Sequence, residues 1–190
     1  ILLGSSCIYP KHCKQPMKEK YLLSGPLEES NDAYAIAKIS GIKMCQYYSD
    51  KYNVNYKSLM PPNLFGPNDN YDLKNSHFFP ALIKKIHNAK KKKIKDLLIW
   101  GTGKAKRELM YVDDFAKAAI FFMKKRFKEP FINIGIGKDY SIDWYAKFIM
   151  KQLKVNLKIK YDLSKPDGMP KKCLDISLAK KYGWSPTVNP

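Results

Sequence analysis

Short apolar segments alternate with longer amphipathic segments along this 190-residue chain. Strands that alternate with helices form mostly parallel sheets, because a parallel connection needs a crossover that a helix can supply. The sequence therefore predicts an α/β protein, with a parallel sheet early in the chain and a smaller α+β region after it. We expect strands at 1–4, 55–60, 96–100, 107–111, 131–134 and 157–161, and helices at about 32–52, 77–89, 112–125 and 141–153, with a last short helix from residue 177.

The chain has enough apolar side chains for a core, but it begins as if inside a fold. Its hydrophobic content is 45%, which argues against disorder. Ile1-Leu2-Leu3-Gly4 reads as the end of a strand, and the segment 185–190 also looks interrupted. We therefore expect an amino-terminal part of the fold, and a short carboxyl end, to lie outside this sequence.

The formal net charge is +18, and a strongly basic chain could bind nucleic acid or an anionic membrane. Nearly all of this charge is lysine, however, with Arg107 and Arg126 the only arginines, and base recognition favours arginine. The lysines are spread along the chain, apart from the run 90–93, and no face with interleaved aromatic residues can be assembled. We expect a lysine-rich surface and no nucleic-acid partner, although a small anionic substrate would benefit from this field.

The four cysteines are Cys7, Cys13, Cys45 and Cys173. They form no C-x-x-C pair and show no metal-ligand spacing with the histidines, so we expect reduced thiols, no metal ion and a cytoplasmic protein. No apolar run approaches the roughly 18 residues needed to span a bilayer, so we expect no membrane partner.

Tyr34 and Lys38 are the first candidates for chemistry. Residues four apart on a helix lie on one face, one turn from each other. A lysine ammonium beside a phenol favours its ionised form, so such a tyrosine can give a proton to a developing alkoxide or take one back. Ser5 and Cys7, just after the first expected strand, add a hydroxyl and a thiol. The Tyr-x-x-x-Lys pattern alone is weak, because chance places it in many proteins.

Further motifs follow in a fixed order along the chain. They are Gly4-Ser5-Ser6-Cys7-Ile8-Tyr9-Pro10, Tyr34-Ala35-Ile36-Ala37-Lys38, Met60-Pro61-Pro62-Asn63-Leu64-Phe65-Gly66-Pro67, Asn75-Ser76-His77, Trp100-Gly101-Thr102-Gly103, Arg107-Glu108-Leu109-Met110-Tyr111-Val112-Asp113-Asp114 and Lys165-Pro166-Asp167-Gly168-Met169-Pro170. Together they resemble the extended short-chain dehydrogenases that act on nucleotide sugars, and among these the GDP-L-fucose synthases. The resemblance covers essentially the whole chain and lacks the family's amino-terminal Gly-x-x-Gly-x-x-Gly phosphate loop.

The resemblance implies a fold and a reaction. The fold would be the carboxyl-terminal part of a Rossmann-type, doubly wound parallel sheet that binds NADP(H), together with a substrate-binding region. The reaction would epimerise GDP-4-keto-6-deoxy-D-mannose at C3 and C5, where the C4 ketone acidifies the protons, and would then reduce C4 with NADPH to give GDP-L-fucose. A homodimer is also implied. We expect the NADP-binding part at 1–66 and about 107–135, and the substrate-binding part at about 67–106 and 136–190.

The resemblance also assigns catalytic roles. Ser5 would hydrogen-bond the C4 oxygen, Tyr34 would protonate it, and Lys38 would tune the tyrosine and hold the nicotinamide ribose. Cys7 would be the base of the epimerisation, provided its neighbours favour the thiolate, and His77 would be the partner acid. The cofactor would contact Leu3, Gly4, Ser5, Ser6, Lys38, Pro61, Pro62, Asn63, Leu64 and His77.

Five residues would contact the substrate. Arg107 would grip the diphosphate through its forked donors, and Trp100 would contact the nucleotide, with a buried core role as the alternative. Lys85 stands where relatives carry an arginine, so it keeps the charge but loses the fork. Lys165 and Asp175 would contact the guanosine side.

One further departure from the family pattern and two alternative functions remain. The family more often has threonine where Pro62 stands, and proline has no N–H to donate. The closest alternative is another extended family member, a nucleotide-sugar 4-epimerase or 4,6-dehydratase. The dehydratases carry Thr-Asp/Glu-Glu where this chain has Ser5-Ser6-Cys7, and a simple 4-epimerase would not need Cys7 with His77. A basic nucleic-acid-binding module is the alternative from another class.

Overall fold

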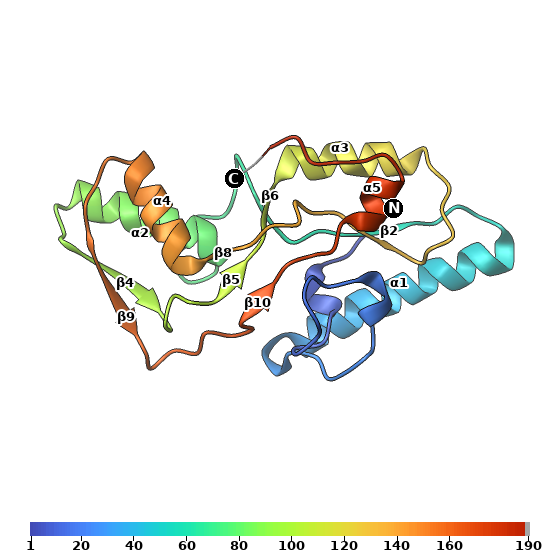
Figure 1. Cartoon of the computed structure of the whole chain (residues 1–190), viewed down its shortest axis with the longest axis horizontal. Coiled ribbons are helices and arrows are strands. Elements are labelled where there is room, and N and C mark those ends of the chain that lie inside the picture. The colour runs from blue at the N-terminus through green and yellow to red at the C-terminus, as the bar shows by residue number, and fades with distance from the viewer. Residues whose placement is uncertain (189–190) are drawn as a thin grey trace. The chain divides into compact units, whose positions relative to one another are not determined.

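The structure is a computed structural model, and it describes residues 1–188. Its contacts divide the chain into two compact units (Figure 1). Unit 1 comprises Ile1–Leu64, Glu108–Asp139 and residues 172–188, and unit 2 comprises Phe65–Arg107 and Tyr140–Lys171. The predicted class, α/β with parallel strands, is confirmed.

Unit 1 is built on a parallel sheet of three strands, in the order β1-β2-β7. Successive residues of a strand point to opposite faces. Accordingly, Leu59 and Ile132 lie in one apolar core, whereas Met60 and Phe131 lie in a second core on the other face. Both faces are therefore covered, as in a doubly wound sheet. The strands are β1 (Leu2–Leu3), β2 (Ser58–Met60) and β7 (Ile132–Asn133).

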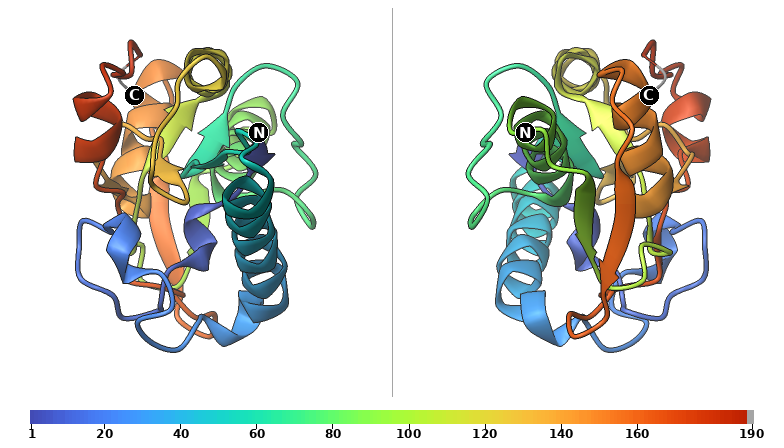
Figure 2. Two further views of the ribbon diagram at one scale, coloured as in Figure 1. Left: turned by 90° about the vertical axis from the view of Figure 1, so that its right-hand side faces the viewer. Right: turned by 90° about the vertical axis from the view of Figure 1, so that its left-hand side faces the viewer.

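Helices cover these two faces. Ile39 and Ile42 of α1 pack in the core that contains Met60, and Phe122 of α3 and Ala179 of α5 pack in the other. Figure 1 shows α1 and α3 on opposite sides of β2, and Figure 2 shows α1 as one long continuous helix. The bounds of these helices are α1 (Asp32–Tyr52), α3 (Val112–Met123) and α5 (Ser177–Lys181). Two short strands, β3 (Asn63–Phe65) and β6 (Leu109–Tyr111), pair with each other. The 3-10 helices are η1 (Ser6–Ile8), η2 (Glu19–Tyr21) and η3 (Glu29–Asn31).

Unit 2 has a parallel pair of strands, β4 and β9, beside the helices α2 and α4. In β4, Leu97 and Ile99 are buried while Leu98 and Trp100 are half or more exposed. The hydroxyl of Ser141 accepts a hydrogen bond from the Trp144 N–H at 3.0 Å and caps α4, as expected. The bounds are α2 (Phe78–Lys91), β4 (Asp96–Trp100), β5 (Lys106–Arg107), β8 (Tyr140–Ser141), α4 (Ile142–Gln152), β9 (Lys158–Asp162) and β10 (Lys171–Lys172), with a small sheet in the order β10-β5-β8.

The last part of the chain differs from the expected division. The sequence predicts all residues from 136 on in the substrate-binding part, whereas unit 1 includes residues 136–139 and 172–188. Two carboxylates hold the segment 172–188 there. The Leu174 N–H donates to Glu108 Oε2 at 2.7 Å, and the Thr187 N–H donates to Asp114 Oδ2 at 2.8 Å. Residues 189 and 190 lie outside the described part of the chain.

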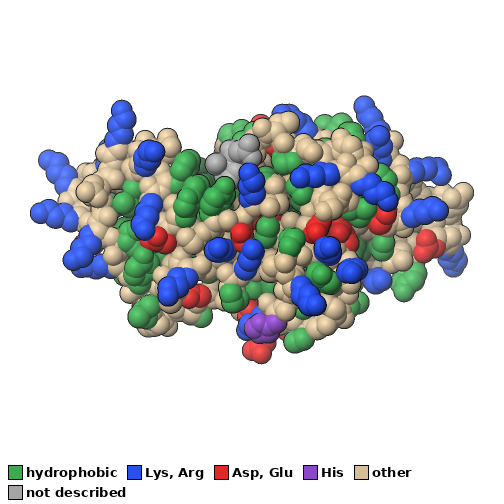
Figure 3. Space-filling model, viewed as in Figure 1, with side chains coloured by type: hydrophobic (Ala, Val, Ile, Leu, Met, Phe, Trp, Pro, Cys, Tyr) green, Lys and Arg blue, Asp and Glu red, His purple; other side chains and the backbone are tan. Residues whose placement is uncertain are grey.

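The surface is rich in lysine, as the composition requires. Figure 3 shows lysine and arginine side chains spread over the visible face rather than gathered in one patch. No helix within residues 1–188 is long and apolar enough to cross a bilayer.

Glu108 is the most deeply buried carboxylate of unit 1, with 1% of its surface exposed. Its Oε1 accepts from the N–H groups of Ile136 at 2.6 Å and Gly137 at 2.8 Å, while its Oε2 accepts from Leu174. Burial raises the pKa of Glu108 to about 7, although these three donors oppose the shift. Gly135 is needed beside it, because a Cβ there would overlap the carboxylate.

The raised pKa of Glu108 predicts a loss of stability with increasing pH. A carboxyl group that ionises less readily in the folded chain stabilises it fully below about pH 4.5 and loses that contribution as the pH rises through about 7. Relative to Glu108→Gln, the intact protein should therefore lose on the order of 3 kcal/mol of unfolding free energy across this range. Urea unfolding from pH 4.5 to 8 measures the difference, with Glu29→Gln at an exposed site as the control. A difference that does not change with pH would contradict this prediction.

Candidate functional site

The structure places the predicted site residues in two groups. Ser5, Cys7, Tyr34 and Lys38 lie in unit 1, together with the expected cofactor residues 3–6 and 61–64. The predicted substrate residues of unit 2 are Lys85, Trp100, Arg107 and Lys165, and His77 belongs to the same unit.

The loop that carries Ser5 and Cys7 is fixed at both ends. At its start, the Gly4 N–H donates to Leu59 O at 2.8 Å and the Ser6 N–H donates to Pro61 O at 2.9 Å. The Ser5 hydroxyl accepts from the Cys7 N–H at 3.2 Å and caps the short helix η1. The expected cofactor residues of the first strand and of the 61–64 segment are thus joined by backbone hydrogen bonds.

At the end of this loop, Tyr9 enters a buried polar network. Its hydroxyl donates to Asn133 Oδ1 at 2.6 Å, and the Asn133 amide donates to the carbonyls of Met17 at 2.9 Å and Asp175 at 3.2 Å. Burial raises the pKa of Tyr9 well above its ordinary value, so this hydroxyl stays a donor. The network holds the loop against the end of β7.

Tyr34 and Lys38 lie on one side of α1, as their spacing predicts. The Lys38 Nζ is 5.5 Å from the centroid of the Tyr34 ring and donates to Leu3 O at 2.9 Å. This bond ties the helix to β1. The Tyr34 side chain is 46% exposed, so its phenol is accessible to a ligand, and a cation beside an accessible phenol suits proton transfer.

Cys7 has a cationic neighbour that no sequence pattern predicts. The Lys172 Nζ lies 3.6 Å from the Cys7 Sγ, and both side chains are half-buried. These residues are 165 positions apart in the chain. Two adjacent lysines, Lys171 and Lys172, are ordinary in a lysine-rich chain, so the sequence does not predict this contact.

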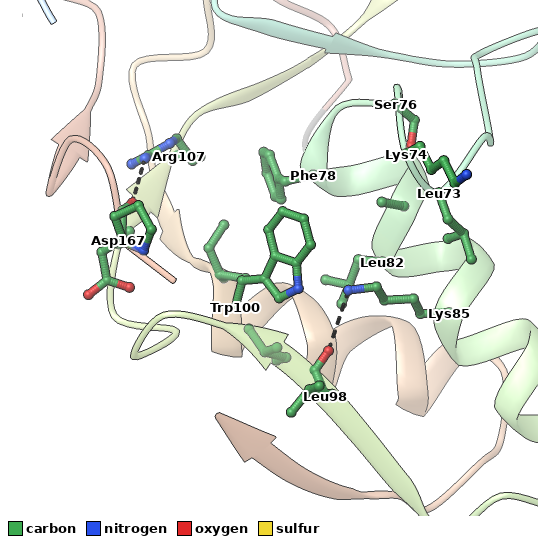
Figure 4. A pocket seen from close by; sticks show the side chains of 15 residues that line it. Leu73, Lys74, Ser76, Phe78, Leu82, Lys85, Leu98, Trp100, Arg107 and Asp167 are labelled. Atoms are coloured by element: carbon green, nitrogen blue, oxygen red, sulfur yellow. Dashed lines mark hydrogen bonds between the residues drawn. The ribbon is translucent and has the colours of Figure 1, made fainter. Parts of the chain in front are cut away.

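Unit 2 contains a pocket of about 280 Å³. It includes three of the predicted substrate residues, Lys85, Trp100 and Arg107, and its wall combines cations with apolar side chains (Figure 4). Such a mixture suits a ligand with an anionic group and a flat ring. The lining residues are Leu73, Lys74, Ser76, Phe78, Ala81, Leu82, Lys85, Leu98, Ile99, Trp100, Ala105, Arg107, Ile142, Pro166 and Asp167.

Trp100 is a surface residue and not part of a core. It ends β4 with 60% of its surface exposed. The Lys85 Nζ lies 5.2 Å from the centroid of its ring and the Lys165 Nζ lies 5.9 Å from it. Lys85 also donates to Leu98 O at 3.5 Å, which Figure 4 shows beside the ring. Partial burial lowers the pKa of Lys85, so an anion that restores a counter-charge there would bind favourably.

Arg107 is held in place by backbone carbonyls. Its Nη1 donates to Met169 O at 2.6 Å and to Lys106 O at 2.8 Å, and its Nη2 donates to Asp167 O at 3.3 Å. The buried Tyr145 hydroxyl in turn donates to Arg107 O at 3.0 Å. A planar guanidinium has five N–H donors in a fixed fork, whereas a lysine ammonium has three and no fixed plane.

Asp167 lines the pocket and is held by Thr102, which lies outside the lining. The Asp167 carboxylate accepts from the Thr102 N–H and from the Thr102 hydroxyl, each at 2.7 Å. These hydrogen bonds lower the pKa of Asp167, which therefore stays ionised. Gly101 has φ of +69°, and a Cβ there would strike the carboxylate, so glycine is required at this turn. Thr102 and Asp167 each stand in a sequence motif, but their pairing across 65 positions is a tertiary contact that no local pattern predicts.

Two predicted residues stand apart from these groups. Asp175 lies in unit 1, where its carboxylate accepts from the Ser177 N–H at 2.9 Å and pairs with Lys18 at 3.8 Å, and it is not among the pocket residues. His77 is exposed and begins α2 without a side-chain cap bond. Within residues 1–188, no group of three or more His, Cys, Asp and Glu side chains could hold a metal ion.

Two curated relatives match almost all of this chain. It is 45% identical over 188 residues to a probable GDP-L-fucose synthase 1 of Oryza sativa subsp. japonica, which covers 99% of this chain and 57% of that protein. It is 46% identical over 189 residues to the GDP-L-fucose synthase of Sinorhizobium fredii, covering 100% of this chain and 60% of that protein. The chain thus spans somewhat more than half the length of these relatives.

A solved structure shows the same fold. The GDP-L-fucose synthetase of Naegleria fowleri bound to NADP superposes with a TM-score of 0.88 at 28% identity, over 99% of this chain and 60% of that one. Residues 1–135, which include Ser5, Tyr34 and Lys38, match the NAD dependent epimerase/dehydratase family. With a parallel sheet covered on both faces and the Tyr-x-x-x-Lys pair on α1, this chain belongs to the NAD dependent epimerase/dehydratase family.

Proposed function

We propose that the protein converts GDP-4-keto-6-deoxy-D-mannose to GDP-L-fucose, by epimerisation at C3 and C5 followed by NADPH-dependent reduction at C4. One observation carries this proposal. A chain that is 45–46% identical to proteins named GDP-L-fucose synthase gathers a serine, a thiol, a tyrosine and a lysine in one unit. A reductase needs the hydroxyls and the lysine, and only an epimerase of this kind also needs the thiol.

The pocket of unit 2 supplies the features that a GDP group requires. Arg107, locked by carbonyls, presents a guanidinium suited to a phosphate. Lys85 adds a partly desolvated ammonium, and Trp100 adds an exposed indole on which a flat base can stack. Lys165, close to the same ring, would contact the guanosine side. Asp175 remains a weaker candidate for that contact, and Asp167 is a better placed carboxylate.

The residues around β1 fit the reactive half of NADPH. Lys38 would hold the ribose, the strand-end backbone at Leu3, Gly4 and Ser6 would lie along the cofactor, and the segment 61–64 would approach the ring. His77 would also contact the cofactor. Pro61 and Pro62 have no N–H, so Asn63 and Leu64 must supply the backbone donors of this segment. When bound, NADPH supplies the hydride for C4.

The epimerisation is assigned to Cys7 and His77. The Cys7 thiolate takes the proton from C3, and the electron pair of the broken C–H bond forms an enolate whose charge rests on the C4 oxygen. His77, as imidazolium, gives a proton to the opposite face of C3. The same exchange follows at C5, after water has restored the thiolate and the imidazolium. Ser5 donates to the C4 oxygen throughout.

The reduction is assigned to Tyr34. As C4 becomes an alcohol, its oxygen needs a proton, which the Tyr34 phenol donates. The Lys38 ammonium beside the ring stabilises the phenolate that remains. Ser5 orients the same oxygen through its hydroxyl.

We further propose a cytoplasmic homodimer. The four free cysteines suit a reducing compartment. Ile36, Met44 and Tyr47 of α1 expose 54–64% of their surfaces, an apolar face that a second copy could cover. The sedimentation coefficient of the intact protein would show whether one or two chains are present.

The alternative is another extended short-chain enzyme for nucleotide sugars, such as a simple 4-epimerase. Such an enzyme would use Ser5, Tyr34 and Lys38 but would not need Cys7 or His77. Solvent exchange at C3 and C5 therefore separates the two functions.

The first prediction concerns Lys85. In the intact protein, Lys85→Met should weaken GDP binding about tenfold, because a partly buried charge-assisted contact is worth about 1.4 kcal/mol or more. Lys85→Arg should bind as well or better. Lys84→Met, one residue away but outside the pocket, is the matched control for net charge. Calorimetric titration with GDP gives the three affinities, and equal losses in the Lys84 and Lys85 variants would remove Lys85 from the site.

The second prediction concerns Tyr34. Tyr34→Phe keeps the ring and removes one exposed hydroxyl, so the fold and GDP binding should not change. The reduction should slow by ~10²–10⁴-fold, the usual loss of a positioned general acid. The measurement is NADPH oxidation with saturating 4-keto sugar. A variant that keeps more than half of the native rate would exclude Tyr34 from this role.

The third prediction separates the two stages. Cys7→Ser and His77→Gln should each slow deuterium incorporation from solvent at C3 and C5, because a base or an acid has been lost. Cys7→Ser leaves Tyr34, Lys38 and the proposed cofactor contacts in place, so it should not slow reduction of an already epimerised 4-keto sugar. NMR of the sugar and NADPH consumption report the two stages separately. Native exchange in both variants would favour the simple 4-epimerase or a plain reductase.

A further inference from the structure

We propose that Lys172 stabilises the thiolate form of Cys7 and thereby prepares it as the base of the epimerisation. This inference rests on the function proposed above. It adds to the site a residue outside the recognised motifs, two positions after Pro170, which acts on the substrate only through the sulfur atom.

The contact itself is the first observation. The Lys172 Nζ lies 3.6 Å from the Cys7 Sγ, a normal length for an N–H donor to sulfur, and both residues belong to unit 1. Both are half-buried, so water screens the interaction only in part. The sulfur remains close enough to the surface to meet a ligand.

Both ends of the contact are anchored through the backbone. On one side, the Cys7 N–H donates to the Ser5 hydroxyl. On the other, Lys172 O accepts from the Glu108 N–H at 3.2 Å, and the Cys173 N–H donates to Gln15 Oε1 at 3.0 Å. The lysine side chain therefore starts from a fixed point, which lowers the entropy cost of holding its ammonium at the sulfur.

The charge of Lys172 is available to the sulfur. Within residues 1–188, its ammonium forms no ion pair with a carboxylate. An ammonium next to a thiol favours the thiolate, which is the form that accepts a proton.

Another thiol of the same unit shows the opposite environment. Burial raises the pKa of the Cys13 thiol, and desolvation is the cause. A cysteine that only packs in the core needs burial and no charged neighbour. The ammonium at Cys7 therefore distinguishes this thiol chemically.

The test is the rate at which iodoacetamide alkylates each cysteine of the intact protein, followed by peptide mass spectrometry at pH 7.5 and low salt. Lys172→Met should slow alkylation of Cys7 by about three- to tenfold, the effect expected of a partly screened charge contact. Lys172→Arg keeps the charge and should retain more than half of the native rate. Lys171→Met removes the same net charge one residue earlier and should leave the rate unchanged. Cys45 serves as the internal reference.

Two results would overturn the proposal at this stage. Equal Cys7 alkylation in the native protein and in Lys172→Met would show that the ammonium does not act on the sulfur. Equal slowing in Lys171→Met and Lys172→Met would show a general charge effect rather than a contact.

A second readout separates this inference from the proposed function. Lys172→Met should slow deuterium incorporation at C3 and C5 by the same factor as alkylation, while reduction of the epimerised 4-keto sugar stays native. If Lys172→Met slows alkylation of Cys7 but leaves deuterium exchange at C3 and C5 unchanged, the role of Cys7 and Lys172 in epimerisation is overturned. If Cys7→Ser also exchanges normally, the base assignment of the proposed function fails, even though the effect of Lys172 on the thiol stands.

Discussion

The buried Glu108 carboxylate is the interaction on which the arrangement of unit 1 depends. It accepts three backbone N–H groups, from Ile136 and Gly137 just after β7 and from Leu174 near the end of the chain. Because Leu174 follows Lys172 by two residues, this carboxylate also fixes the strand that brings an ammonium to Cys7. Burial of the ionised carboxylate costs free energy, and for this reason the pKa of Glu108 is raised to about 7. A substitution at Glu108 would therefore affect stability and the thiol together.

The sequence predicted long, periodic elements well and short ones poorly. The bounds expected for the first helix, about 32–52, agree with α1 (Asp32–Tyr52), and the strand expected at 96–100 agrees with β4 (Asp96–Trp100). The strands β3, β8 and β10 have two or three residues, and only their partners define them. The carboxyl end was expected with the substrate-binding part, because contacts such as that of Thr187 with Asp114 have no signal in a single sequence.

The candidate site could likewise be predicted only in part from the sequence. The Tyr34–Lys38 pair follows from helix spacing alone, and the structure brings the lysine beside the ring. The exposure of Trp100 could have been inferred from the alternation of β4, in which Leu97 and Ile99 point inward. By contrast, the Asp167–Thr102 and Lys172–Cys7 contacts join residues 65 and 165 positions apart. Local pattern carries no information about such pairs.

The lysines show why the position of a charge matters more than the total. The net charge of +18 says little about function, because most lysines are solvated on the surface. Three lysines have defined partners that change what they can do. Lys38 bonds a carbonyl beside a phenol, Lys85 is partly desolvated against an indole, and Lys172 approaches a thiol. In the function we propose, the neighbouring group selects one property of each ammonium: stabilisation of a phenolate, attraction of a phosphate, or stabilisation of a thiolate. Under that proposal the same type of side chain serves proton transfer at one position and anion binding at another, and its local surroundings decide which.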